Sequence, residues 1–169
     1  VTAALEELVR MVVSDKKYGI NIKEENVIGV TMLLADDKGD LTTSRFKMKQ
    51  NLYNKKDILN RTLTGTIVSP ATWYIGKLAA IKEYIHFYDR PLLVAGDSPN
   101  DHHMLFYANV ASKGKRIFVR RKESYYKKTL NEIQRRVILK SEFGKKGLVS
   151  DNVQKGWIFP TPKELGVRP

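Results

Sequence analysis

The chain has 169 residues, of which 42% are hydrophobic, and it contains no cysteine. This length suffices for one domain with a sizeable core, and the lack of cysteine excludes disulfides, zinc–thiolate sites and thiol nucleophiles. The formal net charge is +12 at pH 7, which favours either nucleic acid or phosphorylated small molecules as partners. We do not expect nucleic acid, because the basic doublets are scattered and no aromatic run interleaves with them. No apolar run is long enough to cross a bilayer, so we expect no membrane partner.

The first half of the chain mixes helical and extended patterns. Apolar residues at helical spacing predict a helix over residues 2–13. A β-branched run predicts a strand over 27–34, and the turn at 36–40 predicts a hairpin whose second strand covers 41–48. The polar segment 51–60 is expected to be irregular.

The second half alternates helices and strands, which predicts an α/β fold with a partly parallel sheet and the hairpin as an extension at its edge. The expected elements are a helix over 69–87, a strand over 92–95, a helix over 101–109, a strand over 116–120, a helix over 124–143 that stops at the loop 144–147, and a strand over 157–159.

Two carboxylates come together at one turn of this predicted fold. Asp97 follows the apolar run 92–95, and Asp101 begins the next helix. Ligands of open α/β sheets bind at the carboxyl ends of strands, and two hard oxygen ligands suit Mg²⁺. The same residues are also ordinary turn and helix-capping chemistry, so the spacing alone leaves both interpretations open.

The sequence of this turn, G-D-S-P-N-D, resembles the fourth motif of the haloacid dehalogenase-like (HAD) phosphohydrolases. Lys77, in G-K-L-A-A-I, is similar to the lysine of the third motif. Thr2, in V-T-A-A-L-E-E-L-V-R, is similar to the Ser or Thr of the second motif. The motifs follow in the family's order and span nearly the whole chain. The stretches T-A-A-L-E-E-L-V-R-M-V, E-N-V-I-G-V-T-M-L-L, A-T-W-Y-I-G-K-L-A-A-I and L-L-V-A-G-D-S-P-N-D most resemble HAD members that hydrolyse phosphorylcholine.

The resemblance implies that residues 1–169 belong to one three-layer, Rossmann-like core domain with a hairpin extension. It also implies Mg²⁺-dependent hydrolysis of a small phosphomonoester, phosphorylcholine first of all, through an aspartyl-phosphate. The implied site residues are Asp97 and Asp101 as metal ligands, Thr2, Ala3, Lys77 and Asn100 as phosphate-binding groups, and Lys77 and Thr2 as catalytic groups.

One part of the family pattern is not in this sequence. The first motif, D-x-D-x-T/V, supplies the nucleophile and the general acid–base, whereas D-D-K-G-D at 36–40 has the wrong spacing. We therefore expect the C-terminal part of a phosphatase core, without its central strand and cap and inactive alone. A missing N-terminal segment or a second copy would complete the sheet, because a domain without its central strand exposes backbone edges. Residues 1–7 do not form a signal peptide, so a periplasmic or secreted location rests on resemblance only.

Plainer interpretations stand beside these. Without the resemblance, Lys77 is a surface lysine on the flank of an amphipathic helix, and Thr2 is a helix N-cap. The adjacent His102 and His103 do not form an i, i+4 metal pincer, so we expect them and His86 to be structural.

Two aromatic residues and the substrate class also leave alternatives. Trp73 and Tyr74 are expected to pack in the core rather than hold a quaternary ammonium. The rival functions are another small-molecule HAD phosphatase, of the phosphoserine phosphatase kind, and a non-catalytic basic module that binds phosphate or nucleic acid.

Overall fold

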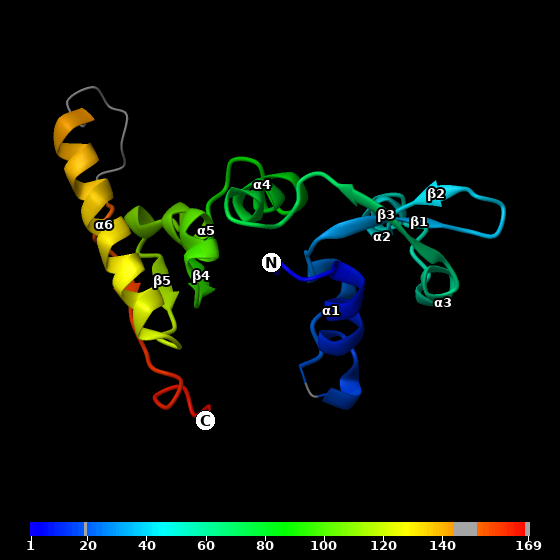
Figure 1. Ribbon diagram of the computed structural model, residues 1–169, viewed down its shortest axis with the longest axis horizontal. Coiled ribbons are helices and arrows are strands. Elements are labelled where there is room, and N and C mark those ends of the chain that lie inside the picture. The colour runs from blue at the N-terminus through cyan, green and yellow to red at the C-terminus, as the bar shows by residue number, and fades with distance from the viewer. Residues whose placement is uncertain (19, 144–151, 168–169) are drawn as a thin grey trace. The chain divides into compact units, whose positions relative to one another are not determined.

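The computed structural model describes residues 1–18, 20–143 and 152–167 (Figure 1). It divides into two compact units, Val1–Ile85 and His86–Pro169, and each unit is considered by itself. No helix in the described ranges is long and apolar enough to span a membrane.

The first unit is built on an antiparallel sheet with the strand order β2-β1-β3 (Figure 1). Its elements are α1 (Glu6–Val13), 3₁₀ turns at Lys16–Tyr18 and Glu24–Asn26, β1 (Thr31–Ala35), β2 (Leu41–Thr42), α2 (Ser44–Lys49), α3 (Lys55–Leu59), β3 (Thr62–Val68) and α4 (Ile75–Tyr84).

Side-chain caps explain where the predicted hairpin fails. The strand predicted over 41–48 ends at Thr42, because the Thr43 side chain accepts a hydrogen bond from the backbone N–H of Phe46 at 3.0 Å and begins α2. Asn54 begins α3 in the same way, accepting from the N–H groups of Lys56 and Asp57, so the prediction of an irregular 51–60 is wrong. Local capping overrides strand propensity at both places.

A buried ion cluster holds the first unit together. The Glu6 side chain, which is completely buried, pairs with Arg10 one turn later on α1 and with Arg45 Nε at 3.0 Å. Its Oε2 atom also accepts the backbone N–H of Gly29 at 2.8 Å. A Cβ at Gly29 would lie 2.7 Å from the Cα of Glu6, so only glycine allows this approach. The cluster fixes α1 against the segment that leads into β1.

The second unit is built on a parallel sheet with the strand order β4-β5-β6; Figure 1 labels β4 and β5. The strands and helices predicted beyond residue 90 are confirmed within a few residues at their ends, and the loop predicted at 144–147 lies outside the described residues. The elements are β4 (Leu93–Gly96), 3₁₀ turns at Pro99–Asp101 and Val110–Ser112, α5 (His102–Tyr107), β5 (Lys115–Phe118), α6 (Glu123–Phe143) and β6 (Trp157–Ile158).

Arg116 on β5 organises the core of this unit. Its side chain is 1% exposed, and its guanidinium donates to the carbonyls of Leu105 at 2.9 Å, Val153 at 3.0 Å and Lys155 at 2.8 Å. Burial, followed by repulsion from other arginines, lowers the pKa of Arg116 to about 10. The side chain thereby joins the end of α5 to the segment that leads into β6.

The two sheets make the molecule a mixed α/β protein, as expected in its broad class. The single three-layer core remains a prediction. Within the described sheet of the second unit, β4 is an edge strand, and Leu93 on it is 61% exposed.

Candidate functional site

The turn after β4 places the two predicted metal ligands next to each other. Asp97 follows Gly96, the last residue of the strand, and therefore lies at the carboxyl end of a parallel sheet. Asp101 is 2% exposed. Its Oδ2 atom accepts hydrogen bonds from the N–H of Asp97 at 3.0 Å and from the N–H and Oγ of Ser98, each at 3.1 Å. The Asp101 side chain does not cap α5, so the N-cap interpretation is wrong. Ser98 caps the Pro99–Asp101 turn instead, and the Asp101 carboxylate reaches back to the N–H groups at the start of that turn.

Gly96 makes this turn possible. A Cβ at this position would lie 2.5 Å from the Cβ and 2.8 Å from the Oδ2 of Asp101. These distances are shorter than any tolerated contact, so the carboxylate occupies the space where a side chain would be. Asn100, the predicted phosphate ligand, lies half-buried in the same Pro99–Asp101 turn. The second unit thus brings three of the predicted site residues onto one turn.

The Asp97 carboxylate holds a cationic side chain. Its Oδ2 atom lies 2.5 Å from Nε of Arg121, and the two side chains are 40% and 56% exposed. Arg121 comes from the loop after β5, the strand next to β4. Arg121 is not among the residues predicted for this site; the signal in the sequence is that it directly follows the strand predicted at 116–120.

The N-terminal segment carries the predicted phosphate-binding residues of the first unit. Thr2 does not cap α1, because the helix begins at Glu6 and the Thr2 hydroxyl accepts from the N–H of Ala4 at 3.2 Å. The N-cap interpretation is therefore wrong. The carbonyl of Thr2 accepts from the Thr72 hydroxyl at 2.7 Å, and that of Ala3 accepts from Trp73 Nε1 at 3.0 Å. These bonds fasten the segment to the residues that precede α4.

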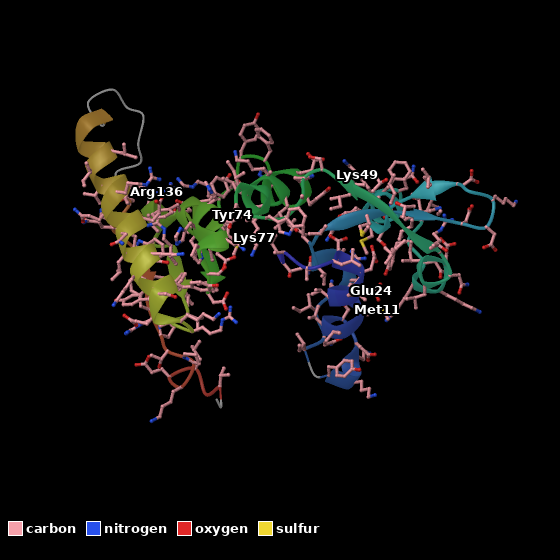
Figure 2. All side chains as sticks on the ribbon, viewed as in Figure 1. Met11, Glu24, Lys49, Tyr74, Lys77 and Arg136 are labelled. Carbon is pink, nitrogen blue, oxygen red and sulfur yellow. The ribbon has the colours of Figure 1, made fainter. Side chains whose placement is uncertain are left out.

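Lys77 is the third residue of α4 (Figure 2). It is 7% exposed, so the interpretation as an ordinary surface lysine is wrong. The chain packs closely around the start of this helix, because a Cβ at Gly76 would lie 1.7 Å from the carbonyl oxygen of Ala71. Buried lysines are rare, because burial disfavours a charged ammonium, and they usually have a structural or functional role.

The predicted residues therefore form two sets, one in each unit. Thr2, Ala3 and Lys77 belong to the first unit and are connected through the 71–76 segment. Asp97, Asn100 and Asp101 belong to the second unit and share one turn. Within the described residues, no group of three or more His, Asp or Glu side chains could hold a metal ion.

His102, Trp73 and Tyr74 are further residues considered from the sequence. His102 lies with Nε2 2.9 Å from Thr129 Oγ1, and burial lowers its pKa; its structural role stays a prediction. Trp73 and Tyr74 were expected to pack in the core, but they are 45% and 59% exposed. Tyr74 precedes α4 with a positive φ of 46°, and Trp73 is directed to the backbone of Ala3, so neither ring enters the core.

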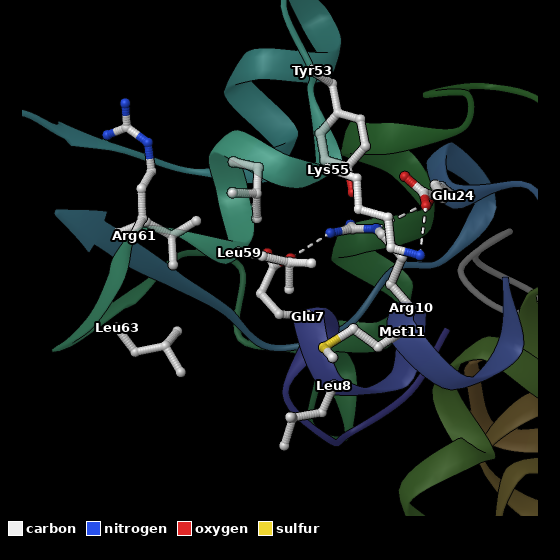
Figure 3. Close-up of a pocket in the computed structure, with 12 residues that line it drawn as sticks. Glu7, Leu8, Arg10, Met11, Glu24, Tyr53, Lys55, Leu59, Arg61 and Leu63 are labelled. Carbon is white, nitrogen blue, oxygen red and sulfur yellow. Dashed lines mark hydrogen bonds and ion pairs between the residues drawn. The ribbon is translucent and has the colours of Figure 1, made fainter. Parts of the chain in front are cut away.

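A separate pocket of about 160 Å³ lies in the first unit between α1, α3 and the sheet (Figure 3). None of the predicted site residues lines it. Its charged rim is neutralised, since Arg10 pairs with Glu7 at 2.7 Å and Lys55 with Glu24 at 3.6 Å. Burial, then a hydrogen bond to Glu24, raises the pKa of Tyr53. The other residues that line it are Leu8, Met11, Leu34, Ile58, Leu59, Arg61 and Leu63. Such a lining suits an apolar group rather than a phosphate.

Comparison with known proteins gives a relative that matches almost the whole chain. A phosphorylcholine phosphatase of Pseudomonas aeruginosa is 38% identical over 166 residues, which is 98% of this chain and 46% of that protein. The chain is a homologue of that phosphatase. It spans less than half of the relative's length. No protein-family model matches the chain.

Among solved structures, the crystal structure of a conserved protein of unknown function from Anaerococcus prevotii matches with a TM-score of 0.49 and 20% identity. The match covers 79% of this chain and 30% of the other.

Proposed function

We propose that the chain is the C-terminal part of a Mg²⁺-dependent, HAD-like phosphomonoesterase that releases choline and phosphate from phosphorylcholine. The observation that carries the proposal is the 38% identity to a phosphorylcholine phosphatase over 98% of the chain. The position of Asp97 and Asp101 at the carboxyl end of β4 supports it, because ligands of parallel sheets bind there.

The residues of the turn fit a divalent cation. The exposed carboxylate of Asp97 faces the guanidinium of Arg121, which supports a site for positive charge at this place. Carboxylate oxygens are the ligands that Mg²⁺ prefers. Asp101, held by three donors, would ligate the ion or a water on it. The ion would supply neutralisation of charge on the phosphate.

The first unit would supply the phosphate-binding groups. The buried ammonium of Lys77 would neutralise the phosphate and the nucleophilic carboxylate. The Thr2 oxygen accepts from Ala4, which leaves the hydroxyl hydrogen to donate to a phosphate oxygen. Thr72 and Trp73 hold this segment in place through its carbonyls.

The nucleophilic Asp would come from an N-terminal segment outside this chain, and that segment or a second copy would complete the sheet. The aspartyl-phosphate would form and be hydrolysed on that residue. The exposed Leu93 on β4, an edge strand of the described sheet, supports a further strand at this position. Export to the periplasm is part of the proposal, and cell fractionation would check it.

The test uses the full-length protein and an Asp97→Asn variant. We expect a loss of about a hundredfold or more in kcat/KM for phosphorylcholine with Mg²⁺ present, because metal stabilisation is worth several kcal/mol. Asp89→Asn is the matched control: it removes the same charge in the same unit from a side chain that is 82% exposed, and it should keep full activity. Undiminished activity in Asp97→Asn would remove this residue as a metal ligand.

The same assay separates substrates. Phosphoserine and phosphorylcholine are offered to the wild-type protein at equal concentration. Faster release of phosphate from phosphoserine would replace the proposed substrate while leaving the phosphatase chemistry in place.

A further inference from the structure

Three consecutive cations follow β5, and only one of them faces the predicted metal ligand. Arg121 pairs with Asp97 at 2.5 Å. Arg120 lies instead 4.2 Å from the ring centroid of Tyr126 and 3.5 Å from Glu123. Lys122 lies over the ring of Tyr125. The pairing of Arg121 therefore depends on its position in the chain and not on a general excess of positive charge.

The sheet itself sets this position. Gly96 and Phe118 are partners in the parallel register, and the N–H of Val119 donates to the carbonyl of Gly96 at 2.8 Å. The carboxyl ends of β4 and β5 are thus fixed side by side. Asp97 is the first residue beyond one strand and Arg121 the third beyond the other, so their side chains meet at the edge where ligands bind.

The pair is accessible and able to open. Its side chains are 56% and 40% exposed, and exposed ion pairs contribute little to stability because water and salt screen them. A guanidinium on a carboxylate also occupies its acceptor oxygen and repels a second cation.

We propose that Arg121 competes with the divalent cation for Asp97 and so raises the cation concentration at which the site fills. This inference rests on the proposed function. In the cation-free protein Arg121 neutralises Asp97, and binding of the cation releases the guanidinium to solvent.

The test is calorimetric titration of the full-length protein with Mg²⁺ in the absence of substrate, which reports binding without activity. In Arg121→Gln we expect Mg²⁺ to bind about two- to five-fold more tightly at low salt, as removal of one exposed ion pair allows. Lys122→Gln removes the same charge from the neighbouring residue and should bind like the wild type. Arg121→Lys keeps the charge and should also stay near the wild type.

Salt gives a second readout. The difference between Arg121→Gln and Lys122→Gln should shrink as ionic strength rises, because the competition is electrostatic. Equal Mg²⁺ affinities in these two variants, or weaker binding in Arg121→Gln, would overturn the inference. The proposed metal site would still stand in that case, provided that the wild type binds Mg²⁺. Absence of Mg²⁺ binding in every variant would overturn both.

Discussion

Each unit of the molecule buries an arginine, and the two are satisfied in opposite ways. Arg10 in the first unit, 3% exposed, pairs with the carboxylates of Glu6 and Glu7. Arg116 in the second unit is 1% exposed. Its guanidinium donates to main-chain carbonyls and lies over the rings of Phe106 and Trp157.

The pKa values record this difference. Burial alone would lower the pKa of Arg10, but the charges of Glu6 and Glu7 outweigh it and raise that pKa. Burial has no such opponent at Arg116, whose pKa falls to about 10. The first unit is therefore held by a buried pair of opposite charges, and the second by one buried guanidinium that donates to main-chain carbonyls of two segments.

The largest effect is expected from breaking the ion cluster. Glu6→Gln would leave Arg10 and Arg45 without their shared carboxylate in a buried place, which costs about 3–5 kcal/mol for a buried pair. Hydrogen exchange by mass spectrometry on the full-length protein should show faster exchange in peptides of α1 and the 27–30 segment. Glu83→Gln breaks an exposed pair at 4.0 Å and should leave exchange unchanged. Equal exchange in the two variants would mean that the cluster is not what holds α1.

A smaller and differently placed effect is expected from Arg116→Met. The substitution keeps an apolar stem beside the rings of Phe106 and Trp157. It removes the donor that Arg116 supplies to the Lys155 carbonyl, whereas the carbonyls of Leu105 and Val153 keep the Ala108 N–H and Trp157 Nε1 as donors. Each buried group left unsatisfied costs about 1–3 kcal/mol. Faster exchange should appear in peptides covering 105–108 and 152–158, and peptides of the first unit should not change. Unchanged exchange at 152–158 would contradict the role of Arg116 in holding that segment.

The same contrast explains what the sequence could predict. In the second unit, the apolar strand runs and the punctuation by Gly and Pro place β4, α5, β5 and α6 within a few residues. The short-range pattern is sufficient there, because Gly and Pro bound the short apolar runs and mark where each element ends. The turn G-D-S-P-N-D was likewise readable as a place where two carboxylates meet.

In the first unit, two kinds of interaction determine the secondary structure: contacts between distant segments, and side-chain caps at the ends of helices. The Thr43 and Asn54 caps ended a predicted strand and began unpredicted helices. Strand β3 carries alternating threonines and becomes a strand only by pairing with β1. The burial of Lys77 could not be predicted, because it depends on contacts between segments far apart in the chain. The position of Arg121 after a predicted strand was readable, but its pairing with Asp97 depends on which strands are neighbours.

The smallest predicted effect separates the units by pH, because all three histidines lie in the second unit. Burial lowers the pKa of His102 in the folded protein. Below the usual histidine pKa of about 6.5 the unfolded chain binds a proton that the folded state resists, so the stability of this unit falls as pH falls through that region.

Hydrogen exchange at pH 7.0 and 5.5, corrected for the intrinsic rate, should therefore show a loss of protection in α5 but not in α1. His102→Gln, which keeps a polar partner for Thr129, should reduce this loss. Because His103 also has a pKa lowered by burial, the loss should shrink rather than disappear. A loss of the same size in both units would mean that carboxylates, which both units contain, set the acid sensitivity instead.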